Sequence, residues 1–160
     1  MSQKAASTEA ERKLQAARRS GARLAAVQAL YQMEQTGQSA RSVIADFMED
    51  RLGLNDEGEP IEEADPEIFK SIVEGVVDKQ EVIDAAIMKR LAEGWKIERL
   101  DATSRAILRG AAYELIADIG LPSQIILDEY VSLAHAFFEG AEPKFINGVL
   151  DSVARDVRGS

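Results

Sequence analysis

The chain has 160 residues, of which 46% are hydrophobic and 29% are charged, and this composition is typical of one globular domain with its own hydrophobic core. It contains no cysteine, which excludes disulfide frameworks and thiolate metal sites. The formal net charge of −9 predicts overall repulsion from nucleic acid.

The N-terminal segment, residues 1–15, is predicted to be a flexible basic tail that precedes one domain over residues 16–158. It lacks the apolar centre of a secretory signal, and no later stretch is long and apolar enough to span a membrane, so we expect a cytoplasmic protein. Residues 1–23 hold six basic and two acidic residues, whereas residues 46–67 hold ten acidic residues and one basic residue. A basic arm on an acidic body suggests a binding site for an anion.

The first half of the chain shows apolar residues at helical spacing. This spacing predicts helices over residues 24–36, 39–52 and 66–79, and a further stripe over 80–95 that either continues the third helix or is kinked from it. Residues 53–65 combine glycine, proline and acidic residues, which predicts a loop before the third helix.

The second half predicts three more helices, over residues 101–119, 122–139 and 144–158. No segment alternates with period two, so we expect an all-α fold of six or seven helices. Gly148 falls inside the last predicted helix, where glycine costs about 1 kcal/mol relative to alanine. We expect a closely packed backbone to account for this glycine, and a binding surface is the alternative.

The basic residues that precede the first predicted helix follow its period. Arg12, Arg19 and Arg23 fall in one sector, and Leu30 continues that sector two turns later. Arginine is rarely buried without a partner, so we expect these first turns to project beyond the core. Guanidinium groups suit phosphate because they donate two parallel hydrogen bonds. The alternative is a solvated basic turn that pairs with the acidic residues 56–67.

Three stretches carry a resemblance to a known family. They are ARRSGARLAAVQALYQME, SRAILRGAAYELIADIGLPSQIILDEYVSLAHAF and KFINGVLDSVAR, which start at residues 17, 104 and 144. In content, order and spacing they resemble the NusB family of bacterial transcription antitermination factors. With the intervening helices, the resemblance covers residues 16–155.

The resemblance implies a fold of two three-helix bundles, with the division expected near residues 95–100. It implies binding of the boxA element of ribosomal RNA leader transcripts together with NusE, a small-subunit ribosomal protein. It further implies action on elongating RNA polymerase with other Nus factors. The family is not enzymatic, so neither catalysis nor a cofactor is expected.

The resemblance also implies site residues. Mapped residue by residue, it implies RNA contacts by Arg19, Arg23, Gln28, Tyr31, Lys144 and Phe145. Ser20 and Gly21 interrupt the arginine cluster that is typical of the family, so the preceding turns are expected to contribute Arg12, Lys13 and Arg18. We expect the NusE surface around residues 83–100 and 104–116, with contacts from Ile87, Arg90, Leu91 and Arg105.

Other interpretations of these residues stay open at this point. Tyr31 and Phe145 are also suited to packing in the core, and Lys144 is also suited to plain solvation. An acidic protein–protein adaptor without RNA specificity is the alternative function. Both a monomer and a homodimer that hides its RNA surface are compatible with the sequence.

The sequence gives little sign of an active site. The single histidine, His135, is predicted on the surface of a helix, where it would be inert. No phosphate-binding glycine loop and no histidine cluster for a metal ion are present.

Overall fold

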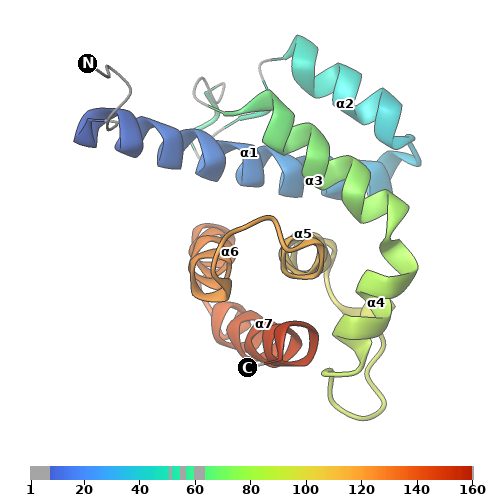
Figure 1. The fold of residues 1–160 in the computed structure, drawn as a ribbon. Helices are drawn as coiled ribbons and strands as arrows, with labels where there is room; N and C mark the ends of the chain where they lie inside the picture. Colours follow the sequence, from blue (N-terminus) through green and yellow to red (C-terminus); the bar gives the residue numbers. More distant parts are fainter. Residues whose placement is uncertain (1–7, 51, 55–56, 60–63, 160) are drawn as a thin grey trace.

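The computed structural model describes residues 8–50, 52–54, 57–59 and 64–159 of the chain. Over these residues it forms seven α-helices, one short 3₁₀ helix and no β-strand (Figure 1). The helices are α1 (Glu9–Thr36), α2 (Ala40–Glu49), α3 (Pro66–Asp78), α4 (Gln80–Met88), η1 (Ile97–Arg99), α5 (Ala102–Ala117), α6 (Ser123–Phe137) and α7 (Glu142–Arg158). The all-α prediction is confirmed.

The longest helix, α1, begins earlier than predicted. The Thr8 side chain accepts a hydrogen bond from the Glu11 backbone nitrogen at 3.0 Å, and the Glu11 carboxylate accepts one from the Thr8 nitrogen at 2.8 Å. This capping box fixes the first turn, and its hydrogen bonds lower the pKa of Glu11. The prediction of a flexible tail over residues 1–15 is therefore wrong for residues 9–15, and residues 1–7 lie outside the described residues.

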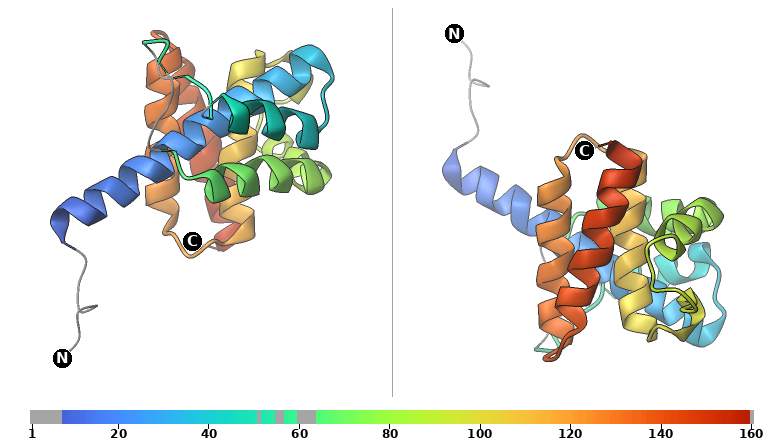
Figure 2. Two further views of the ribbon diagram at one scale, coloured as in Figure 1. Left: turned by 90° about the horizontal axis from the view of Figure 1, so that it is seen from above. Right: turned by 90° about the horizontal axis from the view of Figure 1, so that it is seen from below.

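The helices form two groups of three. α1, α2 and α3 pack together, and α5, α6 and α7 form the second group (Figures 1 and 2). α1 also packs against α5, and α4 packs against both α5 and α7. The N-terminal turns of α1 extend beyond both groups (Figure 2), and residues 11–17 are exposed. The expectation that these turns project beyond the core is confirmed.

Small side chains on α1 allow the two groups to meet closely. Ala22, Ala25 and Ala26 have no exposed surface, and the backbones of α3 and α5 can therefore approach the α1 axis. Aromatic side chains fill the space between α2 and α3. The rings of Phe47 and Phe69 stack there with a centroid separation of 5.5 Å.

The region around α4 confirms one prediction and corrects another. A break at Lys79 separates α3 from α4, so the kinked alternative is correct. α4 ends at Met88, and the predicted helical stripe to residue 95 is wrong over its last turns. The chain turns instead at Gly94, whose φ of 85° is left-handed and favours glycine, and then forms η1.

Two helical glycines have opposite surroundings. Gly75 in α3 lies beneath the ring of Tyr113, and a Cβ atom at that position would overlap the ring. Gly148 in α7 is exposed, and a Cβ atom there would meet no atom within 4 Å. The close backbone packing expected at Gly148 is therefore wrong, and a binding surface is the alternative that is left for this glycine.

Candidate nucleic-acid interface

The N-terminal half of α1 presents cations to solvent. Arg12 and Lys13 are exposed, and Arg18 and Arg19 are half-buried one and a half turns further on. Within the described part of the chain, the side chains of Lys13, Arg18 and Arg19 form no hydrogen bond or ion pair. Their donors are therefore available to an anionic ligand.

Arg23 does not belong to this exposed group. It is 1% exposed, and its guanidinium donates two hydrogen bonds of 2.8 Å to the carboxylate of Glu114 in α5. A third donor reaches Glu129 in α6 at 3.2 Å. The prediction that Arg23 contacts RNA from the surface is therefore wrong, because α5 and α6 enclose its side chain.

The same cluster contains a buried tyrosine and a half-buried serine. The Tyr130 hydroxyl donates to Glu114, and the Ser20 hydroxyl donates to Glu129 at 2.6 Å. Burial, and then the charge of Glu114, raise the pKa of Tyr130 well above 10.0. Burial alone would lower the pKa of Arg23, but the hydrogen bonds and charge of Glu114 outweigh it and raise that pKa. The cluster ties α1 to α5 and α6.

The burial of Arg23 has a signal in the sequence. Arg23 precedes Val27 by four residues and Leu30 by seven, so it lies on the stripe that becomes the core. Its partner Glu114 lies next to Leu115, which is equally buried. An arginine and a glutamate that both fall on apolar stripes indicate a buried pair, because each needs an opposite charge there.

Gln28 and Tyr31 lie in a different place, at a groove between α1 and α2. The Gln28 amide donates to the Leu54 carbonyl at 2.6 Å and accepts from the Leu54 nitrogen at 3.3 Å. Both ends of this amide therefore position the backbone after α2. Tyr31 is 42% exposed and lines the groove, which has a volume of about 780 Å³. The alternative that Tyr31 is a core residue is wrong.

The start of α7 presents a further exposed surface. Lys144 is exposed, Phe145 is 41% exposed, and the bare backbone of Gly148 follows one turn later. Phe145 is therefore only partly used in packing. A cation, an aromatic face and an open backbone together offer contacts to phosphate, base and sugar.

These residues occupy three places and no described cavity contains all of them. Arg12, Lys13, Arg18 and Arg19 lie along the start of α1, and Gln28 and Tyr31 lie on its C-terminal half. α7 starts at the end of the second group that is remote from the α5–α6 connection (Figure 2).

The residues predicted for a protein partner do not form one exposed patch. Ile87 has no exposed surface and belongs to the core, so its predicted role in partner contact is wrong. The Arg105 side chain is 13% exposed and is engaged with Glu34 at 2.8 Å and with the Leu100 carbonyl at 2.5 Å. Arg90 is exposed and donates to Asp156 at 2.6 Å, while Leu91 is half-buried.

Nothing in the described residues suggests a metal centre or a membrane span. No group of three or more potential metal ligands lies together in that part of the chain. None of its helices combines the length and the apolar character that crossing a bilayer requires. His135 is exposed on α6, as predicted.

The chain is similar to proteins from several bacteria. A family model described as "NusB family" matches residues 20–155. The transcription antitermination protein NusB of Hyphomonas neptunium is 63% identical over 142 residues, which cover 89% of this chain and 92% of that protein. The NusB protein of Caulobacter vibrioides is 53% identical and is matched over 88% of this chain and 94% of its own length.

Solved structures agree with this assignment. T. maritima NusB superimposes with a TM-score of 0.70 at 28% identity, over 86% of this chain and 91% of that one. A crystal structure of antitermination factors NusB and NusE in complex with dsRNA gives a TM-score of 0.71 at 27% identity, over 86% and 96% of the two chains. From this evidence and the fold, the chain belongs to the NusB family.

Proposed function

We propose that this protein is a transcription antitermination factor that binds boxA RNA of ribosomal RNA leader transcripts together with NusE. The observation that carries the proposal is its 63% identity, over most of its length, to a transcription antitermination protein NusB. Related structures include NusB and NusE together with dsRNA. Such a factor acts by binding, so it has neither a catalytic site nor a cofactor.

The RNA surface consists first of the cations of α1 that form no ion pair within the described residues. Lys13, Arg18 and Arg19 supply charge-assisted hydrogen bonds to phosphate, with Arg12 beside them on the same helix. Single-stranded RNA also needs faces on which bases stack, because its bases are not paired. Tyr31 and Phe145 are the exposed aromatic residues proposed for this role.

Two of the site residues act indirectly. Arg23 holds α1 against α5 and α6, and Gln28 holds the backbone at Leu54. Both are therefore positioning residues that set where the exposed cations and Tyr31 lie. Lys144 supplies a further phosphate contact from the start of α7.

The acidic body suits the protein partner. The chain has a formal net charge of −9, and its excess of acidic residues lies outside the basic residues 1–23. A ribosomal protein such as NusE is expected to be basic and therefore complementary in charge. The complex would then join elongating RNA polymerase with other Nus factors in the cytoplasm. A homodimer that covers the RNA surface would compete with this assembly.

The test is binding of boxA RNA and of a scrambled RNA, with and without NusE, at two salt concentrations. The variant Arg18→Gln/Arg19→Gln removes two unpaired cations, and Arg41→Gln/Lys79→Gln removes two exposed cations that lie outside the expected RNA and NusE surfaces. We expect NusE to tighten boxA binding selectively. The first variant should weaken it and reduce the slope of log affinity against log salt by roughly 1.4, at about 0.7 per phosphate contact.

The control variant should leave both quantities close to those of the wild type. Equal and negligible binding of both RNAs in the presence of NusE would contradict the proposal. If NusE still bound tightly in that case, a protein–protein adaptor would be the better account.

A further inference from the structure

A second cavity adjoins the basic arm and is not used by the contacts proposed above. It has a volume of about 340 Å³ and lies between α1, α3, α5 and the connection that leads to α6. Its apolar walls are the side chains of Ile68, Ile72, Ile119 and Leu121. Pockets of this size, with apolar walls and a few polar groups, are typical of sites for small ligands.

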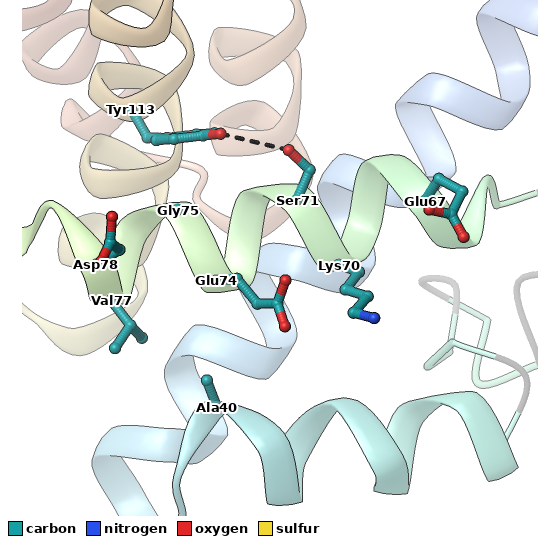
Figure 3. Close-up of a pocket in the computed structure, with 9 residues that line it drawn as sticks. All are labelled: Ala40, Glu67, Lys70, Ser71, Glu74, Gly75, Val77, Asp78 and Tyr113. Atoms are coloured by element: carbon teal, nitrogen blue, oxygen red, sulfur yellow. Dashed lines mark hydrogen bonds between the residues drawn. The ribbon is translucent and has the colours of Figure 1, made fainter.

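The polar wall of the cavity is held in place by packing. Figure 3 shows the neighbouring groove, whose lining shares Glu67, Ser71 and Tyr113 with the cavity. The Tyr113 ring lies flat over Gly75, and its hydroxyl is 3.3 Å from the Ser71 hydroxyl. The ring is therefore fixed before any ligand arrives.

The opposite wall is also fixed. The Arg158 guanidinium donates to the carbonyl of Leu115 at 3.0 Å and to that of Leu121 at 2.6 Å. These hydrogen bonds hold the connection between α5 and α6, which carries two of the apolar lining residues. A preformed cavity binds its ligand without the entropy cost of ordering its walls.

The charged groups of the cavity define the ligand. Arg19 has no ion pair within the described residues, so its guanidinium can accept a phosphate as partner. Glu67, in the first turn of α3, can accept hydrogen bonds from an amino group. Arg23 and Glu114 lie deeper and already satisfy each other.

We propose that this cavity takes up one unstacked nucleotide of the bound RNA, with an amino-bearing base: adenine, guanine or cytosine. The flat base lies between the apolar walls, its amino group donates to Glu67, and its phosphate lies against Arg19. The hydroxyls of Ser71 and Tyr113 can donate or accept at the base edge. Uracil lacks the amino group and can donate to the Glu67 carboxylate only through its single ring N3–H, so it is expected to bind more weakly.

The position of the cavity favours RNA over a peptide ligand. Arg19 belongs both to the cavity lining and to the cations of α1 that are proposed to bind RNA, so a strand bound along α1 passes the opening. A nucleotide carries an amino group that can pair with Glu67 and a phosphate that can pair with Arg19. This inference rests on the proposed function, since it supposes that RNA binds along α1.

The experiment uses the full chain with NusE and boxA RNA. Ile119→Trp fills the cavity, and Ile125→Trp is the matched control, because both isoleucines are 45% exposed and only Ile119 lines the cavity. We expect Ile119→Trp to weaken RNA binding roughly tenfold, the scale of one lost stacked base. Ile125→Trp should leave the affinity unchanged. Thermal unfolding of both variants checks that they are folded.

A second series tests the amino group. Each amino-bearing base of the RNA is replaced in turn by its counterpart without that group, such as hypoxanthine for guanine or purine for adenine. One replacement should weaken binding to the wild type several-fold, and Glu67→Gln should reduce that discrimination. Adenosines that carry a photoreactive azide should crosslink to the peptide containing Tyr113 if adenine is the base bound.

The outcomes separate the two proposals. If the wild type binds boxA selectively but Ile119→Trp behaves like Ile125→Trp, the cavity does not take a nucleotide, and the proposed function stands. If Ile119→Trp weakens NusE binding in the absence of RNA, the cavity belongs to the protein partner and the inference is overturned. If the wild type shows no selective RNA binding, the proposed function itself fails.

Discussion

Arg23 is a charged side chain in the interior of the protein, and its burial depends on the ion pair with Glu114. The two side chains are 2% and 1% exposed and meet through two hydrogen bonds of 2.8 Å. Desolvation of both groups offsets much of their attraction, so the pair contributes less net stability than its geometry suggests. Removal of one partner is costly, however, because the other charge is left buried and unpaired.

Arg23→Met should therefore lower the free energy of unfolding by about 3–5 kcal/mol, since Glu114 loses its partner. The triple variant Arg23→Met/Glu114→Leu/Tyr130→Phe removes the three fully buried polar side chains of this cluster and should recover most of the loss. Urea unfolding monitored by circular dichroism measures both effects. A loss below about 1 kcal/mol in the single variant would contradict a fully buried pair.

The raised pKa of Tyr130 predicts that the free energy of unfolding decreases at alkaline pH. Its folded-state pKa lies above the ordinary 10.0, so the folded protein retains a proton that the unfolded chain releases above that pH. The stabilisation is therefore complete below pH 10 and is lost as the pH rises further. Tyr130→Phe should show a shallower decline above pH 10, by up to about 1.4 kcal/mol per pH unit. Parallel slopes in urea unfolding of the two proteins would refute this.

The helices themselves were predictable where their apolar stripes are continuous. The ends of α5 and α6 follow from spacing and from glycine and proline, whereas the spacing left open whether the chain breaks between α3 and α4. The end of α4 did not follow, because Leu91 continues the stripe in sequence while the chain already turns away after Met88. The periodicity shows which residues are apolar, but it does not predict whether a neighbouring helix is present to bury them.

The site was less predictable than the fold. The family motif predicts the same RNA-binding role for Arg19 and Arg23. In the structure, however, Arg19 is half-buried without an ion pair, whereas Arg23 is enclosed and paired. Their difference depends on Glu114, which is distant in sequence and becomes adjacent only when α5 packs on α1. Likewise Gly148 has no neighbour to explain it, and its open surroundings are visible only in three dimensions.

Gly75 and Gly148 give a direct test at the level of the helix. Gly75→Ala should destabilise the protein by about 1–3 kcal/mol, because the added methyl group forces Tyr113 to move. Gly148→Ala meets no atom and should stabilise it by about 0.5–1 kcal/mol through helix propensity. Thermal unfolding compares the two. Equal effects in the same direction would show that their surroundings do not differ as described.

At the scale of the whole molecule, the arginines that stabilise the fold and the cations proposed to bind RNA are different residues. The ion pairs of Arg23, Arg109 and Arg158 connect helices, whereas Lys13, Arg18 and Arg19 make no ion pair within the described residues. Lys13, Arg18 and Arg19 can therefore be changed without unpairing a buried acid. This separation also allows an acidic protein to present a basic surface.

Lys13→Gln/Arg18→Gln/Arg19→Gln should accordingly change the free energy of unfolding by no more than about 0.5 kcal/mol, as for other surface substitutions. The same variant should lose RNA affinity, and its salt slope should fall by roughly 2. Urea unfolding and RNA titrations on one preparation make the comparison. A large loss of stability would indicate that these side chains hold the fold, and their assignment to RNA would then need another basis.

The early start of α1 has a thermodynamic consequence. Residues 9–15 are already helical and capped, and the same helix continues without interruption into the core. The cations on residues 9–15 are thus carried by a helix that is already formed, so this segment does not have to fold when a ligand binds. Coupled folding produces a large negative heat-capacity change because it buries apolar surface. Association through residues 9–19 should lack that contribution, and its heat should vary little with temperature.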